Sequence, residues 1–164
     1  MTVAVLALGS NLGDRFAHLQ AGVAALAERL PLRAVSSVYE TEPVGGPEQA
    51  CYLNAVVLAE VGPGIDLLEL AQRVEAAQGR QRRERWGPRT LDVDVIAVGG
   101  SRSDNPALTL PHPRAHERAF VLVPWAEADP AAVLPGYGRV TDVLVGLDQH
   151  GVRRRTDLAL PGHR

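Results

Sequence analysis

Two aspartates separated by one residue, Asp92 and Asp94, are the first candidates for chemistry in this sequence. They lie in TLDVDVIAV, an apolar segment that predicts a strand, and side chains two residues apart on a strand point to the same face. Their carboxylates would stand about 7 Å apart and repel each other, and a hard divalent cation relieves that repulsion. Magnesium fits best, because it combines carboxylate oxygens with water and phosphate oxygens. For this pattern alone, however, a solvated strand face is favoured by roughly three to one.

An arginine-rich segment directly precedes the aspartates. GRQRRERWGPR, residues 79–89, surrounds Trp86 with five arginines and is bounded by Gly79 and by a Gly-Pro pair, which is typical of a mobile loop. Guanidinium groups make paired hydrogen bonds to phosphate oxygens, so arginines beside carboxylates indicate joint binding of a polyphosphate by arginine and metal. Two alternatives stay open: pairing with Glu84 and nearby acids on an inert surface, or binding of a nucleic acid backbone. Against the second, the rest of the chain offers neither a basic stripe nor a row of exposed aromatics.

A second same-face pair, Tyr52 and Asn54, lies in the predicted strand YLNAVVLAEV. Asparagine offers a donor and an acceptor, and tyrosine offers a flat ring, which together suit a planar heterocycle with a hydrogen-bonding edge. Taken alone, the pair is more often part of a half-polar sheet face. His112, in LTLPHP, is a minor candidate for donating a hydrogen bond to phosphate, since a loop histidine is more often only exposed.

Other polar features have simpler interpretations. GSNLGDR has the composition of a phosphate cradle, but it lacks the lysine and spacing of a P-loop, so helix capping is the better interpretation. Cys51 has no obvious base partner and reads as a small buried residue. The arginines at 153–155 are most simply solvated charge near a terminus.

The composition is that of an ordinary globular protein in a reducing compartment. The 164 residues are 46% hydrophobic and 22% charged, and a net charge of −2 supplies no basic field for nucleic acid. A single cysteine excludes an internal disulfide framework, and the apolar pattern predicts neither a signal peptide nor a membrane span. We therefore expect one cytoplasmic domain over residues 1–164, a monomer, with no nucleic acid or membrane partner.

The elements that must position these residues follow one another in a recognisable order. TVAVLALGS predicts a strand, and apolar residues at helical spacing from Phe16 to Leu30 predict a helix after it. LRAVSSVYET and YLNAVVLAEV predict two strands, a second helix runs from Leu67 to a cap at Gly79, and TLDVDVIAV is the fourth strand. The order β-α-β-β-α-β predicts an α+β protein with a ferredoxin-like antiparallel sheet. Helices should pack on it in three α-β-α layers, with a C-terminal extension that includes a helix through ERAFVLVPWAEA.

Five segments, in chain order, resemble the 6-hydroxymethyl-7,8-dihydropterin pyrophosphokinase family: ALGSNLGDR, SSVYETEPVG, YLNAVV, VEAAQGRQRRERWGPRTLDVDVI and LTLPHPRAHERAFVLVP. The resemblance runs from about Val3 to Ala128, and RWGPRTLDVDV is its most specific part. It implies transfer of pyrophosphate from ATP to the hydroxymethyl group of a reduced pterin, with release of AMP, in the folate pathway.

The resemblance also implies roles for individual residues. Asp92 and Asp94 would hold two Mg²⁺ ions, and Arg80 and Arg89 match the family's catalytic arginines. Positions around the pterin are Thr41, Val44, Tyr52, Asn54, Trp86 and Phe120, with Tyr52 and Phe120 sandwiching the ring. Positions around ATP are Gln72, Glu75, Arg82, Arg85, Trp86, Val95, Thr109, His112 and Arg118. The chain departs from the family pattern at Glu42, Ala107 and Pro113.

Two further hypotheses compete with this enzyme. One is a non-catalytic ferredoxin-like module that binds nucleotide or RNA through the arginine-rich segment, and the weaker one is a pseudoenzyme that retains only ligand binding. The aspartate pair separates the first alternative from a transferase, because an RNA-binding module gains nothing from two adjacent carboxylates.

Overall fold

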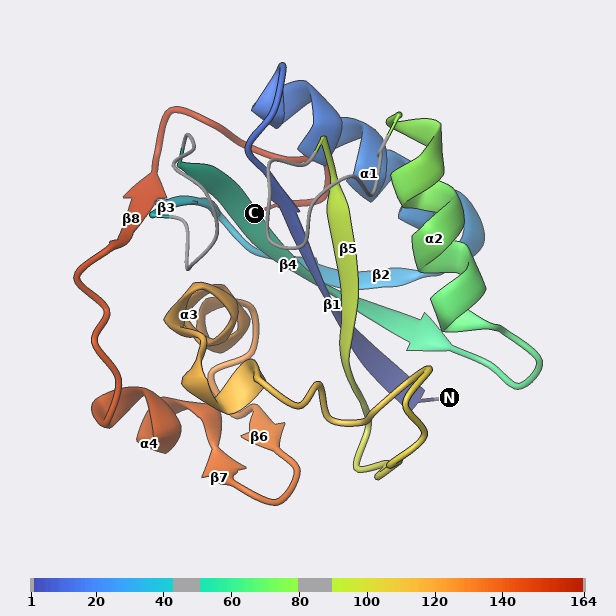
Figure 1. Ribbon diagram of the computed structural model, residues 1–164, viewed down its shortest axis with the longest axis vertical. Helices are drawn as coiled ribbons and strands as arrows, with labels where there is room; N and C mark the ends of the chain where they lie inside the picture. Colours follow the sequence, from blue (N-terminus) through green and yellow to red (C-terminus); the bar gives the residue numbers. More distant parts are fainter. Residues whose placement is uncertain (1, 43–50, 80–89, 164) are drawn as a thin grey trace.

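The computed structural model describes residues 2–42, 51–79 and 90–163 (Figure 1). The elements follow in the order β1 (Thr2–Ser10), α1 (Arg15–Arg29), β2 (Leu32–Val35), β3 (Val38–Thr41), β4 (Tyr52–Val61), α2 (Leu67–Ala77), β5 (Asp92–Val98), a short 3-10 helix (Ala115–Glu117), α3 (Ala119–Ala128), β6 (Val133–Leu134), β7 (Gly138–Arg139), α4 (Val140–Val145) and β8 (Val152–Arg155). The mixed α/β composition expected from the sequence is confirmed. Within the described ranges, no helix is long and apolar enough to cross a membrane.

The main sheet is antiparallel throughout the pairings that the described strands make. Its order is β5-β1-β4-β3-β8, with β2 also pairing with β4. β1 therefore lies between β4 and β5, and it pairs with β4 without interruption from Thr2↔Val61 to Ser10↔Leu53. A second, two-stranded sheet joins β6 and β7 near the C-terminus.

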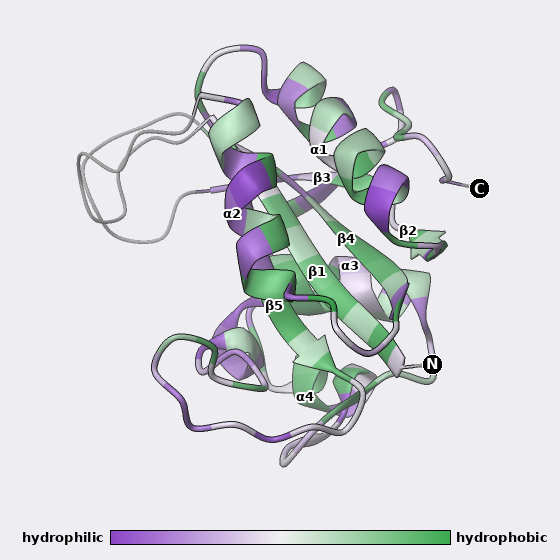
Figure 2. Ribbon diagram, turned by 90° about the vertical axis from the view of Figure 1, so that its right-hand side faces the viewer, coloured by the Kyte–Doolittle hydropathy of each residue, from purple (hydrophilic) through white to green (hydrophobic). Residues whose placement is uncertain are grey.

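Helices cover both faces of this sheet, as Figures 1 and 2 show. Alternate residues of β1 divide between two buried clusters, because successive side chains on a strand point to opposite faces. Leu6 and Leu8 pack with α1 and α2, whereas Val5 packs on the opposite face with α3 and α4. Trp125 of α3 is 3% exposed within the second cluster. The three predicted layers are thus present, and the polar ends of the strands lie beyond these apolar clusters.

The helix boundaries follow local capping chemistry. Asp14 accepts a hydrogen bond from the backbone N–H of Ala17 at 3.1 Å and begins α1, and Asp66 does the same for α2 through Glu69 N at 3.0 Å. Gly79 has a φ of 74°, the left-handed conformation that commonly ends a helix. The capping interpretation of GSNLGDR is therefore confirmed, with Asp14 as the capping residue.

The segment predicted as one strand, LRAVSSVYET, is divided into β2 and β3 by two buried serines. The Ser36 hydroxyl accepts the backbone N–H of Val56 at 2.9 Å and donates to the carbonyl of Ser37 at 2.8 Å. Ser37 donates through both its backbone N–H and its hydroxyl to the carboxylate of Glu127 in α3. Side-chain hydrogen bonds of this kind replace ladder bonds and interrupt the strand.

The interpretation of the arginines near the C-terminus needs correction. The arginines at 153–155 are not simply solvated charge, because they form β8 and pair with β3 from Val38↔Arg155 to Thr41↔Val152. Arg154 also forms a 3.3 Å ion pair with Glu127. The C-terminal extension thereby becomes an edge of the main sheet.

Glu75 of α2 fastens this helix to β5, the outermost strand on the opposite edge. The side chain is 5% exposed, and Oε2 accepts the backbone N–H of Val93 at 2.8 Å. Val93 lies between the two aspartates, so the bond holds the strand at the point where both are presented. An edge strand leaves alternate N–H groups without a strand partner, and Glu75 satisfies one of them.

We expect Glu75→Ala to lower the free energy of unfolding by about 1–3 kcal/mol, because a buried N–H would lose its acceptor. Urea denaturation measures the change. Glu69→Ala is the matched control on the same helix, since that side chain is 58% exposed and forms a surface ion pair with Arg73 at 3.1 Å. The control should stay within about 0.5 kcal/mol of the parent protein. Equal stability of Glu75→Ala and the parent would show that the bond contributes nothing.

Candidate active site

The strand register brings four of the predicted site residues onto one face at one end of the sheet. Gly9 pairs with Asp92 on one side and with Asn54 on the other. Thr41 pairs with Tyr52 on the neighbouring strands. Because directly paired residues point to the same side of a sheet, and residues two apart do so as well, these side chains share a face. It is the face that α3 covers further along the strands.

The aspartates behave as the strand alternation predicts. Asp92 and Asp94 are half-buried, while Val93 and Val95 between and after them are buried on the opposite face. Among the residues that the structure describes, no three His, Cys, Asp or Glu side chains gather as a metal cluster. Two carboxylates on one strand face fit magnesium, which takes few protein oxygens and keeps water or phosphate for its other positions.

A cation lies near this pair. Burial lowers the pKa of Arg118 below its usual value. The negative charge of Asp94, and to a smaller extent that of Asp92, acts in the opposite direction. The Arg118 guanidinium also stands 5.5 Å above the ring of Phe120, a cation–π geometry that orients both side chains. Arg118 and Phe120, at the start of α3, are thereby brought towards the aspartate face.

Asn54 and Thr41 form a buried polar pair. Asn54 is 7% and Thr41 is 4% exposed, and the Asn54 amide donates to the Thr41 hydroxyl. That bond occupies one amide hydrogen and leaves the Asn54 carbonyl and the Thr41 hydroxyl proton for other partners. The arrangement offers a planar ligand a fixed donor and acceptor edge.

Gly9 lies against two predicted site residues, and reasoning from composition and spacing overlooked it. A Cβ placed on Gly9 would stand 2.6 Å from Oδ1 of Asn54 and 3.4 Å from Cδ2 of Tyr52. The strand therefore needs glycine here, since any side chain would displace the asparagine amide. A glycine inside an apolar strand pattern was the available signal, because it often marks close approach by a neighbouring group.

His112 is held in place by hydrogen bonds of both its backbone and its ring. Its backbone N–H donates to the carbonyl of Ile96 in β5 at 2.8 Å, and its Nδ1 lies 3.1 Å from the backbone N–H of Arg114. Because Nδ1 accepts that hydrogen bond, the proton of the neutral ring sits on Nε2. Burial, followed by the positive charges of Arg118 and Arg114, lowers the pKa of His112 from 6.5 to about 4. The ring is thus a neutral donor at pH 7.

The remaining predicted ATP positions are spread over several environments. Gln72 is exposed on α2, and the Thr109 hydroxyl donates to the carbonyl of Asn105 at 3.1 Å. The side chains of Glu75 and Val95 are buried, the first against β5 and the second in the core that α1 and α2 cover. Six predicted residues lie outside the described ranges: Val44, Arg80, Arg82, Arg85, Trp86 and Arg89.

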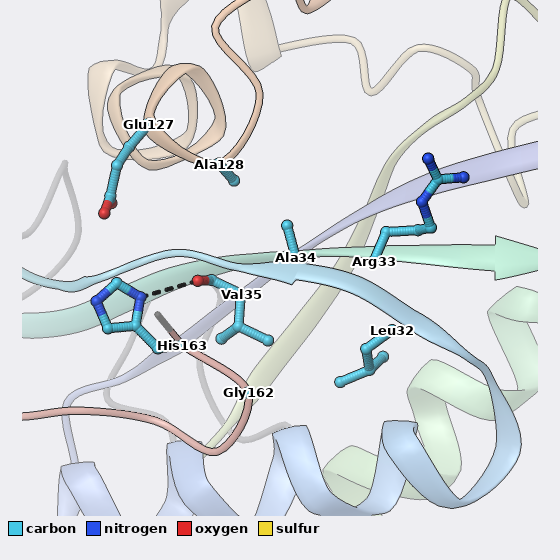
Figure 3. A pocket seen from close by; sticks show the side chains of 8 residues that line it. All are labelled: Leu32, Arg33, Ala34, Val35, Glu127, Ala128, Gly162 and His163. Carbon is cyan, nitrogen blue, oxygen red and sulfur yellow. Dashed lines mark hydrogen bonds between the residues drawn. The ribbon is translucent and has the colours of Figure 1, made fainter.

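A cavity of about 410 Å³ lies elsewhere, between β2, the end of α3 and the C-terminal segment (Figure 3). Glu127 and His163 line it, and the His163 ring bonds the carbonyl of Val35 at 3.0 Å. The cavity contains none of the predicted site residues. Chemistry and register, rather than this hollow, therefore identify the candidate site.

A mixed α/β chain that brings paired carboxylates and a buried amide onto one face of an antiparallel sheet has the features of a small-molecule enzyme. Residues 5–130 match the family model described as 7,8-dihydro-6-hydroxymethylpterin-pyrophosphokinase (HPPK). The chain belongs to this family, which confirms the resemblance carried by the five sequence segments.

Curated relatives support the same conclusion over most of the chain. A 2-amino-4-hydroxy-6-hydroxymethyldihydropteridine pyrophosphokinase of Methylorubrum extorquens is 45% identical over 158 residues, covering 94% of this chain and 99% of the relative. Proteins of the same name from Mycobacterium tuberculosis and Pseudomonas aeruginosa are 46% and 39% identical, covering 82% and 96% of this chain and 76% and 96% of their own lengths.

Solved structures show the same fold. Plasmodium falciparum HPPK-DHPS, the wild type with SDX-DHP, aligns with a TM-score of 0.64 at 12% identity and covers 94% of this chain. The triple mutant with pteroate aligns with a TM-score of 0.65 over 87% of this chain. This chain spans less than half of those proteins, 47% and 42% of their lengths, so the likeness concerns one part of each.

We expect the depressed pKa of His112 to appear in the pH dependence of stability. His112 has a pKa near 6.5 in the unfolded chain and about 4 in the folded protein. The unfolded state therefore binds the proton first, and the free energy of unfolding decreases as the pH falls from 6.5 towards 4. Melting temperatures of the parent and His112→Gln, measured across this range, should converge as the pH falls. His150→Gln, at an exposed position, should follow the parent throughout. A pKa near 6.5 for His112, measured in the folded protein by NMR, would contradict this prediction.

Proposed function

We propose that this chain transfers the pyrophosphoryl group of ATP to the hydroxymethyl oxygen of 6-hydroxymethyl-7,8-dihydropterin, giving the pterin diphosphate and AMP in folate biosynthesis. The observation that carries this proposal is the agreement between family and register. Relatives named for this activity match nearly the whole chain, and the strands place Asp92 on the same face as the Asn54 and Thr41 pair.

Each substrate has a distinct group of described residues. Asn54 and Thr41 would read the polar edge of the pterin, and Tyr52 and Phe120 would enclose its ring, each aromatic contact adding about 0.5–1.5 kcal/mol beyond area burial. His112 would donate from Nε2 to a phosphate oxygen, and Arg118 would add positive charge beside it. The pterin end and the phosphate end of the site are then about a strand apart, because Gly9 separates Asn54 from Asp92.

Asp92 and Asp94 would hold magnesium, in our proposal two ions. When bound, Mg²⁺ neutralises charge on the triphosphate and lowers the pKa of the attacking hydroxyl. The hydroxymethyl oxygen bonds to the β-phosphorus of ATP and gives up its proton to water. The bond from that phosphorus to the oxygen bridging the α- and β-phosphates breaks, and AMP leaves with that oxygen. The chain's own contribution is alignment and fixed charge, with Arg80 and Arg89, outside the described residues, proposed for the charge on departing AMP.

Three broader expectations belong to the same proposal. The order of β5, β1, β4 and the β2–β3 segment supports the ferredoxin-like arrangement, extended at its edge by β8. A cytoplasmic monomer suits an enzyme whose two substrates are small molecules. The alternative of a non-catalytic RNA-binding module is disfavoured by the two half-buried carboxylates, which repel a phosphate backbone.

Supplying the protein with ATP, Mg²⁺ and 6-hydroxymethyl-7,8-dihydropterin should produce AMP and pterin diphosphate in equal amounts, as chromatography of the products would show.

Asp94→Asn should remain folded and lose most turnover in the same assay, because one metal-binding charge is removed. Asp104→Asn, at an exposed aspartate, is the control and should retain activity. Formation of ADP, or turnover that does not depend on the pterin, would refute the proposal.

Gly9→Ala should weaken pterin binding about tenfold or more, because the new Cβ would force the Asn54 amide from its place. Fluorescence titration with 6-hydroxymethylpterin at a saturating, non-hydrolysable ATP analogue measures the dissociation constant. Gly100→Ala is the matched control, since its added Cβ meets nothing within 4 Å. If Gly9→Ala binds the pterin as the parent does, Asn54 does not read the ligand.

A further inference from the structure

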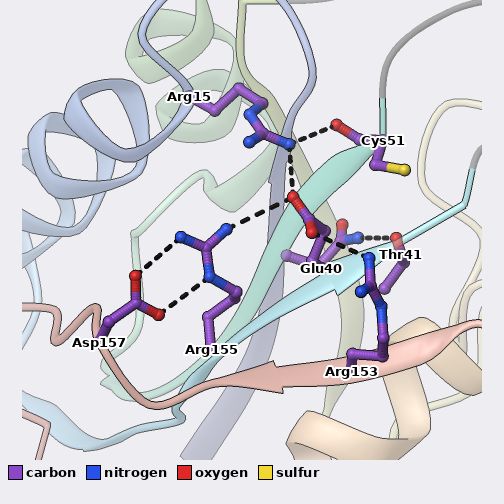
Figure 4. A network of polar contacts seen from close by, with 8 residues as sticks. Arg15, Glu40, Thr41, Cys51, Arg153, Arg155 and Asp157 are labelled. Atoms are coloured by element: carbon purple, nitrogen blue, oxygen red, sulfur yellow. Dashed lines mark hydrogen bonds and ion pairs between the residues drawn. The ribbon is translucent and has the colours of Figure 1, made fainter.

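Arg15, the first residue of α1, joins two strands behind the candidate site (Figure 4). Its Nη1 donates to Oε2 of Glu40 in β3 at 3.0 Å and to the backbone carbonyl of Cys51 at 2.8 Å. The Arg15 and Glu40 side chains are only 27% and 17% exposed. Partial burial strengthens such charge-assisted bonds relative to those on an open surface.

The two residues that Arg15 holds directly precede two site residues. Glu40 precedes Thr41, Cys51 precedes Tyr52, and Thr41 and Tyr52 are register partners. Because side chains alternate along a strand, the Glu40 side chain points to the face opposite Thr41. Arg15 therefore binds the back of the sheet at the place where Thr41 and Tyr52 line the front.

Glu40 has other cationic partners, so neutralising Glu40 can be distinguished from bonding the Cys51 carbonyl, the second role of Arg15. Arg153 and Arg155 of β8 approach its carboxylate at 2.9 Å and 3.4 Å, and Asp157 holds Arg155 at 2.8 Å. Removing Arg15 thus leaves Glu40 neutralised by two arginines. The loss specific to Arg15 is the bond to the Cys51 carbonyl, and with it the bridge between the ends of β3 and β4.

We propose that Arg15 is a positioning residue for the pterin half of the site: it fixes the spacing between Thr41 and Tyr52 from the opposite face of the sheet. The Asn54 amide reaches the Thr41 hydroxyl across the same pair of strands, so its bond depends on that spacing. Asp92 and Asp94, which belong to β5 at the far edge, lie beyond the reach of this bridge. The inference rests on the proposed function for the identity of the ligand.

The test compares Arg15→Met with Arg153→Met. Both remove one arginine from Glu40, but only Arg15 also holds the Cys51 carbonyl. Arg15→Met should raise the dissociation constant of 6-hydroxymethylpterin and the KM for the dihydropterin about tenfold, with kcat and the affinity for a non-hydrolysable Mg²⁺–ATP analogue within about twofold. Arg153→Met should leave all four quantities within about twofold of the parent.

Arg15→Lys provides a second test if the methionine variant does not fold. Both Arg15 bonds come from Nη1, and a lysine keeps the charge opposite Glu40 on a side chain one bond shorter, so pterin affinity should fall by a smaller factor, about threefold. Unchanged pterin affinity in a folded Arg15 variant would overturn the inference. So would an equal loss of pterin and ATP-analogue affinity together with a lower melting temperature, because that pattern denotes general destabilisation. A parent protein that binds no pterin would instead refute the proposed function.

Discussion

The site depends on the register of β1 between β4 and β5. This register places Gly9 in line with Asp92 and Asn54, so the only position that separates the carboxylate from the amide carries no side chain. A slip by one residue would turn every side chain of the strand to the other face and bury the polar set in the α1–α2 core. The buried leucines on the other face, Leu6 and Leu8, oppose such a slip, so the apolar packing that stabilises the fold also aligns the polar site.

A second set of contacts fixes α3 above the same face. Glu127 accepts hydrogen bonds from Ser37 and from the Tyr39 hydroxyl, the latter at 2.9 Å, which fastens the end of α3 to β3. Burial, together with the Glu127 carboxylate, raises the pKa of Tyr39 to about 12, so the phenol remains a donor at any physiological pH. Since Arg118 and Phe120 begin the same helix, their placement near the aspartates depends on this distant polar anchor.

Local patterns in the sequence predicted the parts of this site that lie within one element. Alternation alone put Asp92 and Asp94 on one face, and the predicted cap at Gly79 located the C-terminal end of α2. Patterns within single segments could not reveal contacts between them. The closeness of Gly9 to Asn54 needs the pairing of β1 with β4, and β8 pairs with a strand more than 100 residues earlier in the chain. The division of β2 from β3 likewise depends on Ser37 meeting Glu127 across the molecule.

The charges of the described site bear on the form in which a nucleotide would arrive. Asp92 and Asp94 present two negative charges, and Arg118 presents one positive charge close to them. His112 adds none, because it stays neutral above about pH 4. Among these three charges the two carboxylates outweigh the one guanidinium, and magnesium carried by a triphosphate would offset that excess. A neutral Nε2 donor suits this arrangement, since it can bond a phosphate oxygen without adding a positive charge that would compete for the two aspartates.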